Sequence, residues 1–239
     1  MSQACALHPA IDPAALREAY ARDRRVQIAP FLAGDGAAKL RDHLSDREDW
    51  TLALRAGSRE FAFDPAQQAE LGPDKLAALR SLAAPGEEAG FAYAYERIVA
   101  RLRQSGEQES GTPLADFAAF LSSDPVLALL RNVTGADEIG FVDAKASRYT
   151  PGDFLTLHHD RQDGSTRIAA YVFGLTEGWR AENGGLLLFH EPGGEIERGF
   201  VPAMNALTLF AVPQGHSVSQ VTSFAPVPRL SVTGWLLPR

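Results

Sequence analysis

The chain has 239 residues, of which 45% are hydrophobic and 22% are charged, so its composition is that of a folded globular protein rather than a disordered one. The formal net charge is −7, and the basic residues are scattered among 30 acids without a basic patch, which argues against a nucleic-acid-binding protein. The single cysteine, Cys5, excludes an internal disulfide and a thiolate cage, so any bound metal must be held by histidine and carboxylate side chains.

Two features of the sequence bear on cellular location. The first residues, MSQAC, lack a basic segment followed by an apolar one, so we expect no secretory signal. The sequence contains no run of about 18 apolar residues, so we expect neither a membrane-spanning helix nor a membrane partner. A cytoplasmic location is therefore the expectation.

The first half, residues 1–135, is expected to be mainly helical support with a few strands. Asp12 followed by Pro13 is typical of a helix start, because Asp caps free N–H groups and Pro fits the first helical position. Apolar spacings of three and four residues predict helices, and short apolar or alternating runs predict strands. The predicted helices are 13–25, 36–44, 74–82, 89–103, 114–121 and 125–133, and the predicted strands are 26–32 and 50–55. The polar stretch 104–112 is interpreted as a surface loop rather than a domain boundary.

The second half, residues 136–239, has a different pattern. Short β-branched and aromatic runs alternate with Gly, Pro and Asp, which is typical of an all-β sandwich, barrel or jelly roll. The runs are IGFVDAKASRY, RIAAYVFGL, GGLLLFH, IERGFV, ALTLFAV, SVSQV and RLSVTGWLL. The prediction is one α+β domain, 1–239, with helices packed on a β-core.

The run YTPGDFLTLHHD contains the first candidate site residues. Side chains two positions apart on a strand point to the same face, so His158 and Asp160 are expected side by side, with His159 facing away. An imidazole next to a carboxylate is a natural pair of metal ligands. A third ligand must come from another strand.

His216 follows Asp160 by 56 residues, at the start of the apolar run SVSQV. Two histidines and one carboxylate on one face make the facial triad of non-haem Fe(II) oxygenases, which leaves three metal positions open for a bidentate co-substrate and dioxygen. The same three ligands also suit zinc, so the ligand types alone leave the metal undecided.

Arg229 favours iron over zinc. It follows His216 by 13 residues, and Ser231 follows it at same-face spacing. The planar guanidinium matches a carboxylate. A dicarboxylate that chelates iron with one end and meets Arg229 with the other is 2-oxoglutarate, whereas zinc hydrolysis has no need of this arginine.

The segments YTPGDFLTLHHD, GGLLLF, GH and RLSVTGW, in this order over residues 141–237, resemble the 2-oxoglutarate and Fe(II)-dependent oxygenases, and within them the prolyl 4-hydroxylase-like branch. The enzymes that hydroxylate a proline of a small-subunit ribosomal protein are the most similar. The first half fits more loosely, through FAYAYERI and PLADFAAFLSS. The resemblance implies a double-stranded β-helix (jelly-roll) core.

The resemblance also implies roles for individual residues. His158, Asp160 and His216 would bind the metal as the catalytic centre, and Arg229 would bind the co-substrate. Tyr149, nine residues before His158, matches a family tyrosine that hydrogen-bonds 2-oxoglutarate. A second such tyrosine, present in some relatives on the next strand, is not clearly matched here. Tyr171 and Phe173 lie near the corresponding position, and the role is left unassigned. The roles of His190, Arg161 and Arg167 are also left open.

The function implied is a 2-oxoglutarate-dependent dioxygenase that uses Fe(II) and O2, with ascorbate as reductant, and forms succinate and CO2. The expected substrate is a prolyl residue of a protein, and a ribosomal protein is one candidate. One alternative is hydroxylation of a free amino acid or another small metabolite, because a fold does not determine its substrate. Another is a non-catalytic module that senses iron or 2-oxoglutarate.

Overall fold

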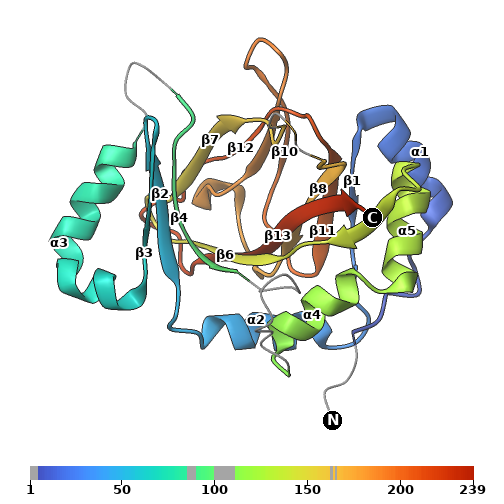
Figure 1. The fold of residues 1–239 in the computed structure, drawn as a ribbon, viewed down its shortest axis with the longest axis horizontal. Helices are drawn as coiled ribbons and strands as arrows, with labels where there is room; N and C mark the ends of the chain where they lie inside the picture. The colour runs from blue at the N-terminus through green and yellow to red at the C-terminus, as the bar shows by residue number, and fades with distance from the viewer. Residues whose placement is uncertain (1–4, 85–89, 100–110, 162–163, 165) are drawn as a thin grey trace.

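The structure is a computed structural model that describes residues 5–84, 90–99, 111–161, 164 and 166–239 (Figure 1). Its α-helices pack around one curled β-sheet. The helices are α1 (Pro13–Asp23), α2 (Gly36–Ser45), α3 (Pro65–Ala83), α4 (Pro113–Leu121) and α5 (Asp124–Thr134). The strands are β1 (Arg25–Ile28), β2 (Thr51–Ala56), β3 (Arg59–Phe63), β4 (Tyr93–Val99), β5 (Ile139–Val142), β6 (Lys145–Tyr149), β7 (Phe154–His158), β8 (Ala169–Gly174), β9 (Leu187–His190), β10 (Ile196–Phe200), β11 (Ala206–Ala211), β12 (His216–Val218) and β13 (Arg229–Pro238).

The helix starts follow the local chemistry of the sequence. The Asp12 side chain accepts hydrogen bonds from the N–H groups of Ala14 and Ala15, which confirms the predicted cap of α1. Asp64 and Gln67 form a reciprocal capping box at the start of α3, so this helix begins well before the predicted residue 74. A break at Gly72, where φ is positive, explains why only its second half showed a helical pattern.

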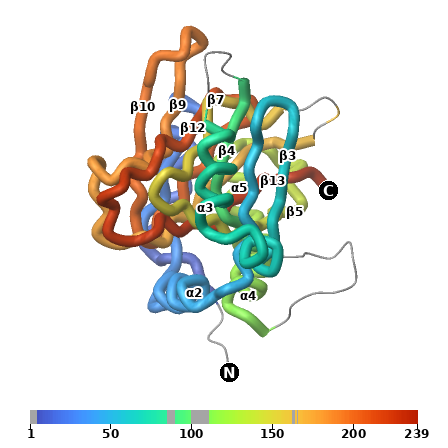
Figure 2. Tube along the Cα trace, turned by 90° about the vertical axis from the view of Figure 1, so that its left-hand side faces the viewer, coloured from blue at the N-terminus to red at the C-terminus, as the bar shows by residue number. Residues whose placement is uncertain are grey.

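The strands form one antiparallel sheet in the order β1-β11-β8-β13-β6-β4-β7-β12-β9-β10. Outside this order, β2 pairs with β4 and with β3, and β5 pairs with β13. The sheet curls, so β8, β13 and β6 face β7, β12 and β9 across an interior cavity (Figure 1). This is the predicted jelly-roll core, and the fold class is confirmed by the solved structures described below. The β9–β10 and β2–β3 hairpins project from it (Figure 2).

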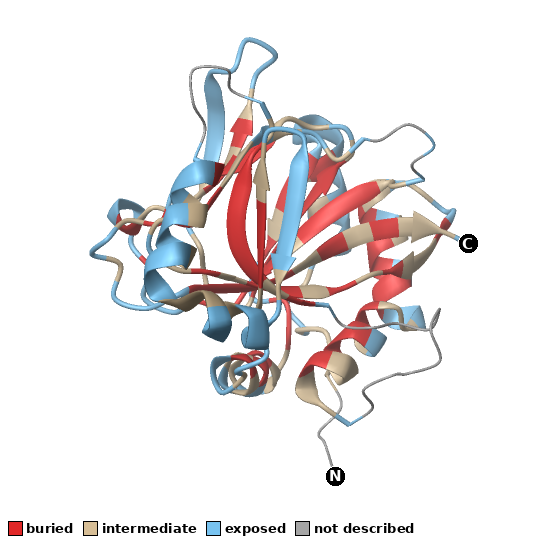
Figure 3. Ribbon diagram, turned by 60° about the vertical axis from the view of Figure 1, so that its left-hand side comes forward, coloured by how far each residue is buried: buried red, intermediate tan, exposed pale blue. Residues whose placement is uncertain are grey.

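The helices cover the outer face of the sheet. Residues of α1, α2, α4 and α5 join the outward side chains of β8 and β11 in the largest apolar cluster, while α3 packs on β2 and β4. Buried residues therefore concentrate on the central strands, and exposed residues on the outer helix surfaces and hairpins (Figure 3). Within the described residues no single helix is long and apolar enough to cross a bilayer, and only the bent pair α4–α5, taken together, meets that test.

One prediction for the first half is wrong, and one strand was missed. The helix predicted at 89–103 is strand β4 in its described part, and it lies between β6 and β7 in the core sheet. Strand β3 was not predicted, because it is short and mostly exposed. The loop predicted at 104–112 falls outside the described residues except for its last two positions.

Candidate active site

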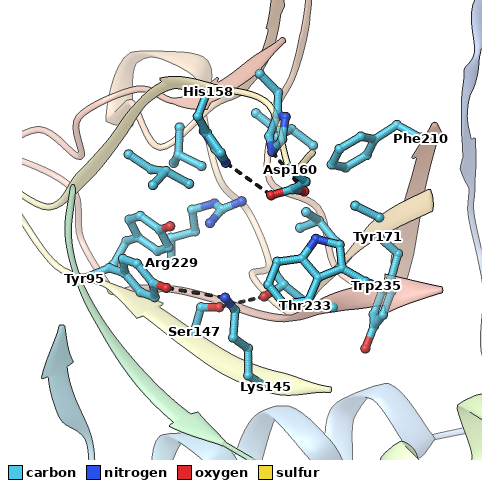
Figure 4. A pocket seen from close by; sticks show the side chains of 18 residues that line it. Tyr95, Lys145, Ser147, His158, Asp160, Tyr171, Phe210, Arg229, Thr233 and Trp235 are labelled. Carbon is cyan, nitrogen blue, oxygen red and sulfur yellow. Dashed lines mark hydrogen bonds and ion pairs between the residues drawn. The ribbon is translucent and has the colours of Figure 1, made fainter. Parts of the chain in front are cut away.

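The structure brings the three predicted metal ligands together. His158 is the last residue of β7 and lies opposite His216, the first residue of β12, in the antiparallel pairing of these strands. Asp160 follows β7, and its carboxylate oxygens lie 3.6 Å from Nε2 of His158 and 3.7 Å from Nε2 of His216. The three candidate ligand atoms all lie within 4.8 Å of one another (Figure 4). His159, by contrast, is exposed, as predicted.

Backbone carbonyl groups orient both imidazoles. Nδ1 of His158 lies 3.0 Å from the carbonyl oxygen of Thr156, and Nδ1 of His216 lies 2.9 Å from that of Gln214. A carbonyl oxygen can only accept, so each Nδ1 carries the proton and each Nε2 keeps its lone pair facing Asp160. This is the arrangement by which neighbouring groups orient histidine ligands of a metal.

Burial keeps both imidazoles neutral. Desolvation, together with the neighbouring His216 ring, lowers the pKa of His158 to about 4. Desolvation also lowers the pKa of His216. The His158 ring stacks on Phe91, with ring centroids 4.8 Å apart, and Phe210 contacts the His216 ring edge-on at 4.7 Å. Both histidines are therefore uncharged at neutral pH, as metal ligation requires.

Arg229, the first residue of β13, lies in the wall of the same cavity. The residue is 3% exposed, and burial lowers its pKa. Its Nε has no hydrogen-bond partner, and Oγ of the neighbouring Ser231 is likewise buried and unpaired. No carboxylate forms an ion pair with Arg229 among the residues that the structure describes. A buried cation of this kind needs an anion to compensate it.

Tyr149, the last residue of β6, lies opposite Arg229 in the strand register, with its ring 5.0 Å from the guanidinium carbon. Its ring also stacks on Tyr95 of β4 at 5.1 Å. Burial raises the pKa of Tyr149, so its hydroxyl stays protonated and can donate. The structure thus places Tyr149 beside Arg229 as the resemblance implies, and its contact with 2-oxoglutarate stays a prediction.

Neither candidate for the second tyrosine supplies a hydroxyl to the cavity. The Tyr171 hydroxyl donates to the carbonyl oxygen of Asp143 and points away from the metal ligands (Figure 4). Phe173 lies in the core cluster beneath the helices. Tyr95 of β4, which the sequence did not suggest for this role, does line the cavity beside Tyr149.

The residues whose roles were left open occupy different places. Arg167 donates to the carbonyl oxygen of Asp160 at 2.9 Å, and its guanidinium lies 3.6 Å from the ring centroid of Trp235. His190 pairs with the hydroxyl of Ser217 at 2.8 Å. Arg161 is exposed. Arg167 therefore helps to hold the loop that carries Asp160.

The sequence reasoning missed several cavity residues, among them Tyr95, Lys145 and Trp235. Nζ of Lys145 lies 3.5 Å from the Tyr95 hydroxyl and 5.0 Å from the Trp235 ring centroid. Lys145 and Trp235 lie at same-face spacing from Tyr149 and Arg229 on their strands, and this alternation is the signal that could have identified them. Tyr95 was hidden by the incorrect helix prediction for β4.

The donor set fits Fe(II) and 2-oxoglutarate. Two neutral imidazoles with free Nε2 atoms and one carboxylate suit a divalent first-row metal and leave further coordination positions for a chelating co-substrate. The unpaired Nε of Arg229 offers a buried donor for a carboxylate in the same cavity.

A jelly-roll core with a His–Asp–His cluster and a buried arginine in one cavity defines the class of non-haem iron oxygenases. Residues 144–237 match the family model of the 2OG-Fe(II) oxygenase superfamily. The resemblance predicted from the sequence is therefore confirmed: over these residues the β-core of this chain is similar to that superfamily.

A curated relative also falls in the class of non-haem iron oxygenases. The chain is 32% identical over 111 residues to prolyl 3-hydroxylase sudestada1 of Drosophila melanogaster, and the match covers 41% of this chain and 20% of the relative. The chain thus matches only about one fifth of that relative's length.

Solved structures show the same fold at low identity. A prolyl 4-hydroxylase from Pseudomonas putida aligns with a TM-score of 0.59 at 21% identity, over 95% of this chain and 100% of its own. A prolyl hydroxylase from Trichoplax adhaerens, in complex with a fragment of the hypoxia-inducible factor oxygen degradation domain, aligns with a TM-score of 0.61 at 13% identity, over 95% and 89%.

Proposed function

We propose that this protein is a 2-oxoglutarate- and Fe(II)-dependent dioxygenase that hydroxylates a prolyl residue of a protein substrate. One observation carries the proposal: the buried, uncompensated Arg229 opens into the cavity that holds the free Nε2 atoms of His158 and His216. When bound, Fe(II) with 2-oxoglutarate and O2 supplies oxidative decarboxylation to succinate and CO2, coupled to insertion of one oxygen atom into a C–H bond.

The residues of the chain have distinct tasks in this reaction. His158, Asp160 and His216 would hold the metal, and Arg229 would bind the distant carboxylate of 2-oxoglutarate, with Tyr149 as a further donor. The apolar wall formed by Phe210 and its neighbours keeps bulk water away from the metal face. The work of the protein is positioning and exclusion of water, while the cofactors supply the redox chemistry.

A peptide substrate is supported by the shape of the site. The cavity opens into a wider groove that runs past His158 and reaches Glu197 of β10. The Trichoplax relative was solved with a peptide fragment, and the Drosophila relative is named as a prolyl hydroxylase. A ribosomal protein as substrate, ascorbate as reductant and a cytoplasmic location belong to the proposal as well.

The experiment is a hydroxylation assay with purified protein, Fe(II), ascorbate and 2-oxoglutarate. Proline-containing peptides, ribosomal ones included, and a panel of free amino acids are screened by mass spectrometry for a gain of one oxygen atom. A gain on a peptidyl proline, with succinate formed in equal amount, is the expected result. If only a free amino acid gains the oxygen atom, the substrate is a small metabolite and not a protein. If the iron-loaded protein shows no turnover, the result supports a non-catalytic sensing module.

A further inference from the structure

Lys145 lines the cavity. The proposed binding of the metal and of 2-oxoglutarate gives this cation no role. Its ammonium lies 5.0 Å from the Trp235 ring centroid and 5.8 Å from that of Tyr95, so it sits over two aromatic faces. Among the residues that the structure describes, its one polar contact is the long 3.5 Å approach to the Tyr95 hydroxyl. No ion pair to Lys145 is formed within the described part of the chain.

The strand register separates Lys145 from Arg229. On the cavity face of β6 and β13, Tyr149 lies opposite Arg229, and Lys145 lies opposite Thr233. Four residues along a strand correspond to about 13 Å. Arg229 lines the inner cavity but not the wide groove, whereas Lys145 lines both. Lys145 therefore stands at the junction where a substrate enters, opposite the metal ligands (Figure 4).

The contacts of Lys145 leave hydrogen-bond donors available there. An ammonium group has three N–H donors and no acceptor. The ring faces of Trp235 and Tyr95 hold its charge without consuming those donors. Arg229 and the metal already account for both carboxylates of 2-oxoglutarate, so the partner of Lys145 must be an oxygen atom of the substrate.

The charges that line the groove indicate whether the substrate oxygen that binds Lys145 is neutral or charged. The groove rim carries glutamates as well as arginines, so it offers no uniformly positive surface to a strongly acidic ligand. The acids are Glu60, Glu191 and Glu197, and the arginines are Arg24, Arg55, Arg97 and Arg167. A neutral carbonyl oxygen of an extended peptide fits this mixed rim better than a carboxylate does.

We propose that Lys145, held between Tyr95 and Trp235, anchors the substrate by donating a hydrogen bond to a main-chain carbonyl oxygen of the bound peptide. This inference rests on the proposed function, because it requires a peptide in the groove. It makes Lys145 a residue that selects peptides and takes no part in binding iron or 2-oxoglutarate.

The test compares Lys145→Met, which keeps the apolar stem and removes the donors, with Lys75→Met on the exposed surface of α3. Lys145→Met should raise the KM for the peptide about 10- to 100-fold, the range expected for a lost charge-assisted hydrogen bond. Its KM for 2-oxoglutarate should match that of the wild type. Lys145→Arg, which keeps a cationic donor, should recover part of the loss, and Lys75→Met should change nothing.

Two results would overturn the inference. An unchanged peptide KM in Lys145→Met would show that the ammonium makes no productive contact, and a raised KM for 2-oxoglutarate would assign it to the co-substrate. Because both comparisons start from a wild-type protein that turns over peptide, a wild type without any turnover counts against the proposed function and not against Lys145. Thermal unfolding of each variant shows whether a loss reflects misfolding.

Discussion

At the scale of single residues, the site is defined by what each polar group lacks as much as by what it contacts. His158 and His216 use the same local device, in which Nδ1 donates to the carbonyl oxygen two residues earlier and Nε2 stays free. Arg229 is a buried guanidinium with an unpaired Nε. These groups are costly in an empty cavity and become favourable when a metal and a carboxylate arrive.

Arg229→Met should raise the KM for 2-oxoglutarate about 100-fold, which corresponds to ~2.7 kcal/mol and lies within the range for truncating a buried charged partner. Iron binding should be unchanged, because Arg229 contacts none of the predicted ligands. The ligand-free variant should be no less stable than the wild type, since it loses an uncompensated buried charge. Titration of 2-oxoglutarate into metal-loaded protein measures the first effect, and an unchanged affinity would refute the assignment.

At the scale of elements, α3 is fastened to the strands that carry the site. Nε of Arg80, in the last turn of α3, lies 3.0 Å from the Asp153 carboxylate, which is fully buried. The other carboxylate oxygen of Asp153 accepts hydrogen bonds from the backbone and hydroxyl of Thr150, directly after Tyr149. Helix and β6–β7 turn are thus tied together beside the cavity.

Arg80→Met should destabilise the protein by about 3 kcal/mol, because it leaves the buried carboxylate of Asp153 without its cation. Burial already raises the pKa of Asp153 above its usual value, and loss of Arg80 raises this pKa further. A carboxyl whose folded-state pKa lies above its unfolded-state pKa reduces stability as pH rises between the two values. The loss should therefore be larger at pH 8 than at pH 5.

Urea unfolding at both pH values measures this effect. Arg22→Met is the matched control, because Arg22 pairs with Asp23 on the exposed surface of α1 and should leave stability unchanged. Equal losses for the two variants would contradict the fastening role of Arg80.

The same elements show what could be predicted from the sequence. The metal ligands and Arg229 were predictable because fixed spacings on strands carry them. β4 was not, since the alanine, glutamate and arginine in YAYERIV favour helix, and burial on both faces removes the polar–apolar alternation of a half-buried strand. Lys145 and Tyr95 meet only through the pairing of β4 with β6, which is a tertiary contact that no local pattern encodes.

At the scale of the whole molecule, one face of the curled sheet forms the apolar core and the other face forms the cavity. Helices cover the outer face of the sheet, where the largest apolar cluster lies, and its inner face holds the cavity, which polar side chains line together with apolar ones such as Phe210. Because the cavity residues come from opposite parts of the sheet, among them β6, β12 and β13, ligands that bridge them should stabilise the entire fold.

Saturation of the site with Mn(II) as a redox-stable substitute for iron, together with 2-oxoglutarate, should therefore raise the thermal unfolding midpoint. At ligand concentrations of about 100 times Kd the gain is ~2.7 kcal/mol, or roughly 5–10 °C for a chain of this size. Chelation of the metal should reverse the shift. In Arg229→Met the part of the shift that depends on 2-oxoglutarate should be absent at the same concentrations, and its persistence would count against this site.

The central claim is that His158, Asp160 and His216 form an iron centre that consumes 2-oxoglutarate. The measurement that tests it most directly is the rate of succinate formation by purified protein with Fe(II), 2-oxoglutarate and O2, beside folded His158→Ala and Asp160→Ala variants and the His159→Ala control. The account predicts iron-dependent succinate formation by the wild type and the His159→Ala control, and none by the two ligand variants. Succinate formation that survives either ligand substitution, or a wild type that forms none when loaded with iron, would contradict it.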